Sequence, residues 1–351
     1  MDLKTVDSAP FNAEKFVHNL LEEGTKHFCD ESTKCFNEND KLPPFYDATM
    51  YKRGQKFFND NIFALLLSKF LGLLTVLSIP SIVRILIYTK MSGSPITAYK
   101  RYMATVLHMV IWYRSDFTPG SKLWQSVTEV RNKHNSASKR CCTAGLGRFS
   151  QKDMALTQFG FMGYALAMRE KIGLHGATNE DLQGLVHVWR VIGYVMGVED
   201  RFNICRDSVD ETTAICRTLA YKVFKPAIEK KDKDFIEMAT YLSDGMWSMN
   251  PTLNAKIYIN MLYKLLKVPN NNNNNLEKEE LSVELNFLQR MILNMLIFVV
   301  WTLQFTIPKL YHNYTQYISL WLMRVFPFLA YYQFGYSDDS HVYVLRDNKT
   351  N

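Results

Sequence analysis

The chain has 351 residues, of which 47% are hydrophobic and 21% are charged, and this composition excludes intrinsic disorder as its main state. Its length allows one large domain or two ordinary ones. The net charge of +7 comes from basic residues that are scattered, without a dense run and interleaved aromatics, so we expect no nucleic-acid partner. The excess of positive charge is compatible with binding to an anionic membrane surface or to the acidic groups of a cofactor.

The first part of the chain contains a polar leader and one apolar segment. Residues 1–46 are polar and mixed in character, and we expect them to pack on another part or to fray. The apolar segment 61–87 is interrupted by Lys69, Pro80 and Arg84. Its longest charge-free run, 70–83, is shorter than the roughly 20 residues that a membrane-spanning helix needs. The segment therefore predicts a buried core helix with a kink at Pro80.

The middle of the chain predicts successive helices over 97–114, 122 to about 139, 153–172 and 179–196. Capping signals begin the last two of these helices, at Ser150 and Thr178, and Gly173 and Gly197 follow their ends. Short loops between long helices indicate antiparallel neighbours. We therefore expect an all-α bundle over residues 47–267.

The end of the chain changes in character. A low-complexity linker at 268–280 is followed by a hydrophobic region, 281–351. Here 18 uncharged residues, 291–308, form a transmembrane candidate, and a second apolar block, 317–332, carries aromatic residues as found at membrane interfaces. Two interpretations stay open, membrane attachment or two further buried helices.

Polar residues in three of the predicted helices are candidates for a site. Arg101, Thr105 and His108 follow one stripe of the helix over 97–114, which indicates either a polar pocket lining or a solvated face. On the following helix, Arg131 and His134 share a face. The helix over 179–196 has a second stripe, Gln183, His187, Arg190 and Tyr194, which predicts a hydrogen-bonded seam or a site wall. Common catalytic motifs are missing, so any chemistry would need a cofactor held by His and Arg.

Five sequence elements in the same order resemble the catalytic domain shared by ER-bound oxygenases and bacterial rubber oxygenases (latex-clearing proteins). They are Arg101 with Thr105, FTPG at 117–120, VR-x-x-H at 130–134, SQ-x-D-x-x-x-T-x-F at 150–159 and H-x-WR-x-x-G-x-x-x-G at 187–197. The resemblance covers about residues 55–260 and implies a globin-like helical bundle with haem b as cofactor and O₂ as co-substrate.

The resemblance also implies roles for individual residues. His134 would be the proximal iron ligand, and Arg101 and Thr105 the distal residues, with His108 one turn further along. His187 would be a partner of the proximal ligand or a second pocket wall. Arg131 or Arg190 would neutralise the haem propionates.

The chain departs from the rubber-cleaving members at two places. Ala104 stands where they have a lysine, and no carboxylate lies between Asp60 and Asp116 to match their upstream glutamate. We expect a haem-dependent oxygenase that acts on an apolar isoprenoid- or lipid-like substrate at a membrane, such as the endoplasmic reticulum, or alternatively in the cytoplasm. Two other functions stay open. One is a non-enzymatic haem- or lipid-binding membrane protein with a degenerate oxygenase fold. The other is a non-haem iron oxygenase using His134, His187 and a carboxylate such as Asp153.

Overall fold

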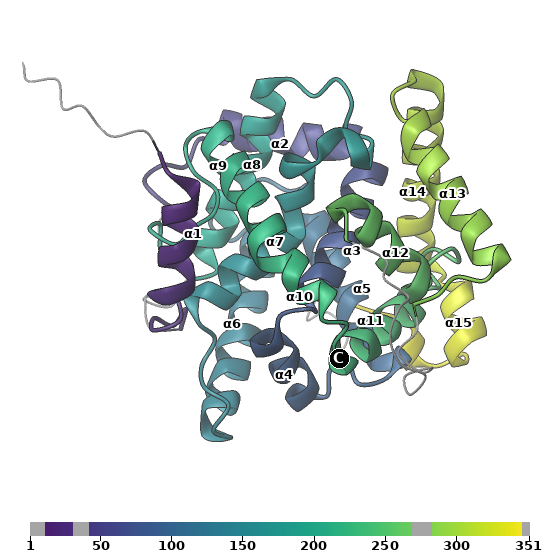
Figure 1. Cartoon of the computed structure of the whole chain (residues 1–351), viewed down its shortest axis with the longest axis horizontal. Helices are drawn as coiled ribbons and strands as arrows, with labels where there is room; N and C mark the ends of the chain where they lie inside the picture. The colour runs from purple at the N-terminus through teal and green to yellow at the C-terminus, as the bar shows by residue number, and fades with distance from the viewer. Residues whose placement is uncertain (1–10, 31–41, 269–282, 346–351) are drawn as a thin grey trace, which may run out of the picture.

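The computed structural model describes residues 11–30, 42–268 and 283–345, and within them the fold is all-α, as predicted (Figure 1). An isolated bridge between Phe28 and Ser150 is the β-type pairing found in this part of the chain. The α-helices are α1 (Ala13–Glu22), α2 (Ala48–Asp60), α3 (Ile62–Val76), α4 (Pro80–Thr89), α5 (Pro95–Trp112), α6 (Lys122–Thr143), α7 (Gln151–Ala167), α8 (Asn179–Val195), α9 (Val209–Thr218), α10 (Lys225–Glu229), α11 (Lys233–Met246), α12 (Ala255–Leu266), α13 (Phe287–Thr302), α14 (Thr306–Val325) and α15 (Phe328–Phe334).

Helix α3 lies in the core of the bundle and is apolar on nearly all sides. Such a helix is stable only when other elements surround it, and α7, α12 and α14 pack on it. The prediction of one kinked helix over 61–87 is wrong in one respect. The chain leaves the helix after Val76 and begins a new one at Pro80, because proline suits the first turn of a helix and lacks the N–H that an interior position must donate.

Side-chain caps start the helices that carry the candidate residues. The Ser94 and Thr97 side chains form a reciprocal capping box at the start of α5, and Thr178 and Asp181 form another at α8. Ser150 Oγ accepts a hydrogen bond from the backbone N–H of Asp153 (3.1 Å) and caps α7. These caps fix where each helix begins and therefore which face it turns to the bundle.

Two pairs of glycines allow helices to cross with their backbones in contact. A Cβ atom on Gly54 of α2 would lie 2.2 Å from the carbonyl oxygen of Gly184 on α8. A Cβ atom on Gly72 of α3 would lie 2.1 Å from the carbonyl oxygen of Gly160 on α7. Both distances are far below van der Waals contact, so the two crossings depend on glycine.

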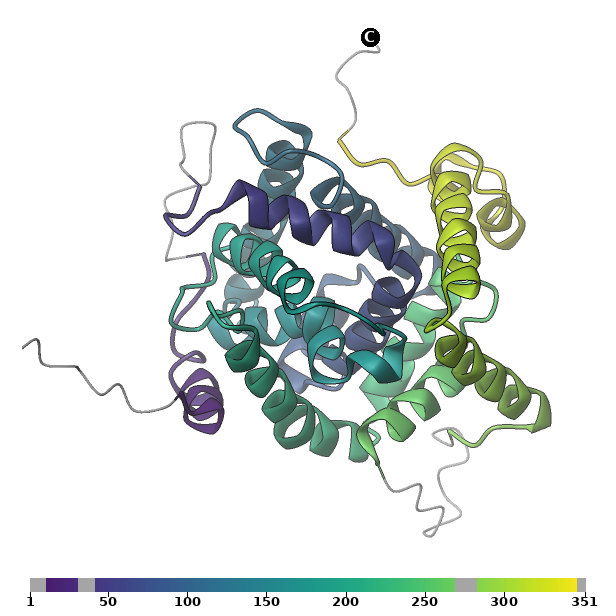
Figure 2. The ribbon, with the colours of Figure 1, turned by 90° about the horizontal axis from the view of Figure 1, so that it is seen from above.

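The first and last helices lie on the outside of the bundle, α1 at one end and α13 to α15 along the opposite flank (Figures 1 and 2). Within the predicted leader, α1 buries Val17 and Leu20 and packs against α9. Helices α13 and α14 pack on α12 and α3. The predicted linker at 268–280 lies outside the described residues except for Val268, and the division of the chain into four regions remains a prediction.

The predicted uncharged segment 291–308 is not one helix. It breaks after Thr302, and α13 and α14 meet at a bend of 117°. In the described part of the chain, no single helix is long and apolar enough to cross a membrane. Two bent pairs of helices have together the length and composition of a membrane-spanning segment. They are α2 with α3 (bend of 93°) and α13 with α14.

Candidate functional site

A cavity of about 840 Å³ lies among α4, α5, α6, α7 and α8, and this volume is within the range of cofactor and ligand pockets. Its wall is largely apolar, with polar groups from α5 and α6 and a few from α7. Four of the predicted site residues line it. They are Arg101, Thr105, His108 and His134.

Helix α5 presents its predicted polar stripe to this cavity. Arg101 is half-buried and donates to Ser92 Oγ (3.4 Å). The hydroxyl of Thr105 donates to the Arg101 carbonyl one turn earlier (3.0 Å), so its oxygen can still accept a hydrogen bond. His108 is 3% exposed, and the alternative of a solvated face is therefore wrong for this part of the stripe.

His108 belongs to a buried hydrogen-bonded network that joins α5 to α6. Its Nδ1 lies 2.8 Å from Ser126 Oγ, and that oxygen accepts a hydrogen bond from Trp112 Nε1 (2.9 Å). On the other side of the ring, Nε2 faces Glu129 Oε1 at 3.7 Å, and Lys133 donates to the same carboxylate (2.5 Å). Burial lowers the pKa of His108 to about 4, so the ring is neutral near neutral pH.

A charged carboxylate therefore lies beside this neutral imidazole. Partial burial pushes the pKa of Glu129 upward, but the hydrogen bond and the positive charge of Lys133 outweigh it, and the pKa falls below its usual value. With Ser126 donating to Nδ1, the His108 proton would sit on Nε2, facing Glu129. The pair can hold or pass a proton at the wall of the cavity.

His134 reaches the same cavity from α6. Its Nδ1 is buried and has no hydrogen-bond partner in the described structure, and its ring meets Phe149 edge to face with the centroids 6.3 Å apart. Burial, aided by the charge of Arg101, lowers the pKa of His134 to about 4. A neutral imidazole with available nitrogen in a cofactor-sized cavity has the chemistry required of an axial ligand.

The structure does not bring the other three predicted site residues to the cavity. Arg131 is buried toward α8, where Nη1 donates to the Val195 carbonyl (2.8 Å). Arg190 forms ion pairs with Asp200 (3.1 Å) and Asp207 and stacks on the ring of Phe45.

His187 serves a structural purpose at the start of α2. Its Nε2 accepts a hydrogen bond from the backbone N–H of Asp47 (3.0 Å), and its ring packs beside Tyr46. It is therefore not the partner of His134. The proposed iron ligands His134, His187 and Asp153 do not converge, and no group of three or more His, Cys, Asp or Glu side chains among the described residues could hold a metal ion.

Two carboxylates line the cavity, Glu129 of α6 and Asp153 of α7. Glu129 was missed by sequence reasoning, and Asp153 was named only as a possible iron ligand. Asp153 accepts a hydrogen bond from Ser81 Oγ (2.7 Å) and lies 3.5 Å from Lys152 Nζ. The available signal for Glu129 was its i,i+4 pairing with Lys133 beside Val130 and His134. Glu129 lies on a different helix from Arg101, so closeness in sequence to that arginine does not indicate it.

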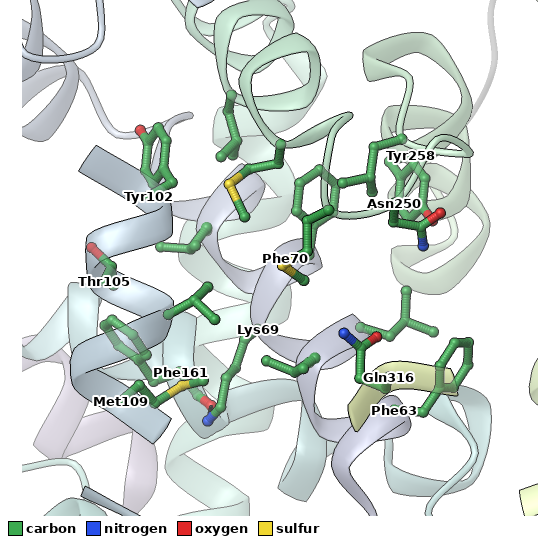
Figure 3. A pocket seen from close by; sticks show the side chains of 18 of the residues that line it. Phe63, Lys69, Phe70, Tyr102, Thr105, Met109, Phe161, Asn250, Tyr258 and Gln316 are labelled. Atoms are coloured by element: carbon green, nitrogen blue, oxygen red, sulfur yellow. Dashed lines mark hydrogen bonds between the residues drawn. The ribbon is translucent and has the colours of Figure 1, made fainter. Parts of the chain in front are cut away.

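A second, narrower pocket of about 70 Å³ adjoins the cavity (Figure 3). Leu73, Tyr102, Thr105 and Phe161 line both spaces, so the two are separated by shared side chains. The rest of the narrow pocket is mainly apolar, and Leu296 and Val300 of α13 with Gln316 of α14 close its outer side.

The wall of the narrow pocket contains a buried lysine. Lys69 extends from α3 toward Phe161, and its Nζ donates to the Phe161 carbonyl (3.0 Å) (Figure 3). Four aromatic rings surround the amine with centroids 4.8–6.0 Å away, and burial holds its pKa well below the usual value.

Comparison with solved structures finds a latex clearing protein, in its closed state, with a similar fold. The superposition has a TM-score of 0.54 and covers 88% of each chain, at 13% sequence identity. No protein-family model and no curated protein matches the sequence. At this identity the comparison shows the fold alone, and the chain accordingly has an all-α fold similar to that of a latex clearing protein.

Proposed function

We propose that the chain is a haem-dependent oxygenase that acts on an apolar, isoprenoid- or lipid-like substrate. This proposal rests on one observation. His134 of α6 lines the same cavity as Arg101, Thr105 and His108 of α5. The fold, similar to that of a latex clearing protein, and the sequence elements around these residues support it.

The residues present fit haem in the chemistry of their donors. His134 would hold the iron, because its ring is neutral and its Nδ1 has no partner in the described structure. Lys100, Lys133 and Arg140, rather than Arg131 and Arg190, line the cavity and would face the propionates. When bound, haem would supply an iron centre that can activate O₂.

The other cavity residues would stabilise charge, transfer a proton and position the substrate. The fixed charge of Arg101 would stabilise negative charge that develops in the cavity. His108 and Glu129, with 3.7 Å between Nε2 and Oε1, would hold and pass a proton, and so would take the role of the missing upstream acid. The apolar pocket beside Thr105 would accommodate part of the substrate and exclude water.

The first test is the absorption spectrum of the purified chain after addition of haem. We expect a Soret band that is shifted from that of free haem, and we expect His134→Ala to lose the shift because the residue that would hold the iron is removed. His187→Ala is the matched control, because that ring lies away from the cavity, and it should keep the wild-type spectrum. No band in the wild type, or an unchanged band in His134→Ala, would end the proposal.

A second candidate function is a haem- or lipid-binding protein without catalysis. Ala104, which lines the cavity where the rubber-cleaving members have a lysine, favours it. Oxygen uptake by the haem-loaded chain with polyisoprenoid and fatty substrates decides between the two. A Soret band without substrate-dependent uptake favours binding, whereas uptake that falls in Arg101→Ala favours the oxygenase. Location at a membrane, such as that of the endoplasmic reticulum, is part of the same proposal.

A further inference from the structure

The outer surface of α13 and α14 is apolar although it faces outward. Phe298, Ile307 and Trp321 expose 60%, 81% and 59% of their surface. The inner faces of the same helices are apolar as well, since Leu296 and Val300 of α13 and Leu320 of α14 are buried against the bundle. A helix that is apolar on both sides is expected to be covered on both sides.

The charged residues that α13, α14 and α15 themselves carry are of one sign. Between Glu284 and Asp338 the sequence contains Arg290, Lys309 and Arg324 and no acidic residue. Exposed tyrosines and tryptophans lie among these cations. They are Trp301, Tyr311, Tyr314, Trp321, Tyr332 and Tyr336. Amphipathic aromatic side chains together with cations are typical of surfaces that lie at the boundary between lipid headgroups and acyl chains.

We propose that the outer faces of α13 and α14, here called the hairpin surface, dock in the plane of an anionic lipid bilayer. The apolar side chains would enter the boundary of the acyl chains, and Arg290 and Arg324 would meet anionic headgroups. The bend of 117° and the inward polar residues Asn313 and Gln316 suit attachment to one leaflet rather than a span. The proposal rests on the membrane location proposed above and does not depend on haem or on catalysis.

A second copy of the chain fits this surface less well. A two-fold dimer would place the same patch on both sides of the interface. Cations would then lie across from cations with no carboxylate of the flank to balance them, whereas an anionic bilayer complements them. The hairpin surface also lies directly outside the narrow apolar pocket, which Leu296, Val300 and Gln316 close.

Flotation of the full chain with vesicles tests the proposal. We expect the protein to float with phosphatidylcholine vesicles that contain phosphatidylserine, and more weakly with phosphatidylcholine alone. The double variant Ile307→Ser/Tyr314→Ser should lower the apparent affinity at least about tenfold, because two exposed apolar groups no longer enter lipid. Ile87→Ser/Tyr221→Ser is the matched control on other exposed helices and should float like the wild type. Circular dichroism should show that all of these variants are folded.

Two further measurements test separately the positive charge of the hairpin surface and the depth to which it enters the bilayer. Arg324→Glu should reduce the gain from phosphatidylserine, whereas Lys230→Glu, exposed elsewhere, should not. Brominated acyl chains should quench the tryptophan fluorescence, and the quenching should disappear in Trp301→Phe/Trp321→Phe.

Failure of the wild type to float would overturn the proposal, as would a double variant that floats normally. A dimer in solution that Ile307→Ser/Tyr314→Ser dissociates, with no flotation, would assign the surface to a second copy. Because flotation needs no haem, these outcomes are independent of the Soret test.

Discussion

At the scale of single residues, His108 combines a buried position with a depressed pKa. Burial lowers the pKa to about 4, whereas an unfolded histidine titrates near 6.5. The unfolded chain therefore binds a proton that the folded chain does not bind between these two pH values. The contribution of the neutral ring to stability is complete above about pH 6.5 and is lost as the pH falls toward about 4.

We therefore predict that His108→Gln weakens the acid dependence of stability. Urea unfolding at about pH 7.5 and about pH 5 should give a smaller difference for the variant than for the wild type. Part of the dependence will remain, because His134 is also neutral through burial. His18→Gln, at an exposed position of α1, should behave like the wild type. Equal acid dependence in His108→Gln and the wild type would contradict the prediction.

The candidate site could be predicted from the sequence where helical spacing alone decides it. Arg101, Thr105 and His108 share a face of one helix, and this local geometry brought them to the cavity together. The prediction failed for Arg131, because its side chain extends to the Val195 carbonyl of α8 and does not line the cavity, although it lies one turn from His134. Spacing within one helix does not decide between these two directions. The pairing of Glu129 with His108 depends on how α5 crosses α6, and no pattern within one helix specifies that crossing.

At the scale of elements, the crossing of α2 and α8 depends on Gly54. In an exposed helix an alanine would be more favourable than glycine by about 1 kcal/mol. Here the added Cβ would meet the Gly184 carbonyl oxygen at 2.2 Å, a backbone atom that cannot move aside. We predict that Gly54→Ala destabilises the protein by about 1–3 kcal/mol, measured by urea unfolding.

Gly93→Ala provides the control for this substitution. A Cβ atom at Gly93, in the turn before α5, would meet no atom within 4 Å. This variant should keep or slightly raise the free energy of unfolding, because alanine restricts the unfolded chain. If Gly54→Ala were as stable as Gly93→Ala, the two helices would be able to separate without loss, and the close contact would not matter.

The boundaries of the elements were predictable where a residue imposes them chemically. Caps at Ser150 and Thr178 begin the third and fourth predicted helices, and the left-handed Gly197 follows the end of the fourth. The third α-helix ends at Ala167 and not at 172, and Gly173 ends the short 3₁₀ helix Arg169–Ile172 that follows it. The break after Thr302 had a chemical signal that the prediction did not use, because Pro308 lies in the first turn of α14, a position that suits proline as it does at Pro80. Helix α13 packs on α12 and helix α14 packs on α3.

At the scale of the whole molecule, one buried apolar cluster extends from α1 to the C-terminal helices. It includes Leu20 of α1, Leu71 of α3 and Leu296 of α13. Polar contacts join the same parts, since Tyr317 of α14 donates to the Asn59 carbonyl of α2 (2.9 Å). The C-terminal helices therefore share the core with the cavity-bearing bundle.

From this shared core we predict that the described helices unfold in one cooperative transition. The fluorescence of Trp301 and Trp321, taken as the difference from a Trp301→Phe/Trp321→Phe variant, should follow the same urea curve as the circular dichroism of the whole chain. An earlier fluorescence transition would show instead that α13 and α14 unfold by themselves.

Asn313 tests the same coupling by substitution. Its side chain donates to the Asp60 carbonyl (2.8 Å) and accepts from the Phe63 N–H (3.1 Å), so it joins α14 to the junction between α2 and α3. Asn313→Ala leaves both backbone groups, which are partly buried, without this partner and should lower the free energy of unfolding by about 1–3 kcal/mol. Both probes should shift together, because the lost contacts belong to the shared core. Thr315→Ala, whose hydroxyl bonds only within α14, should change stability little. A loss confined to the fluorescence curve in Asn313→Ala would mean that α14 is held separately from the bundle.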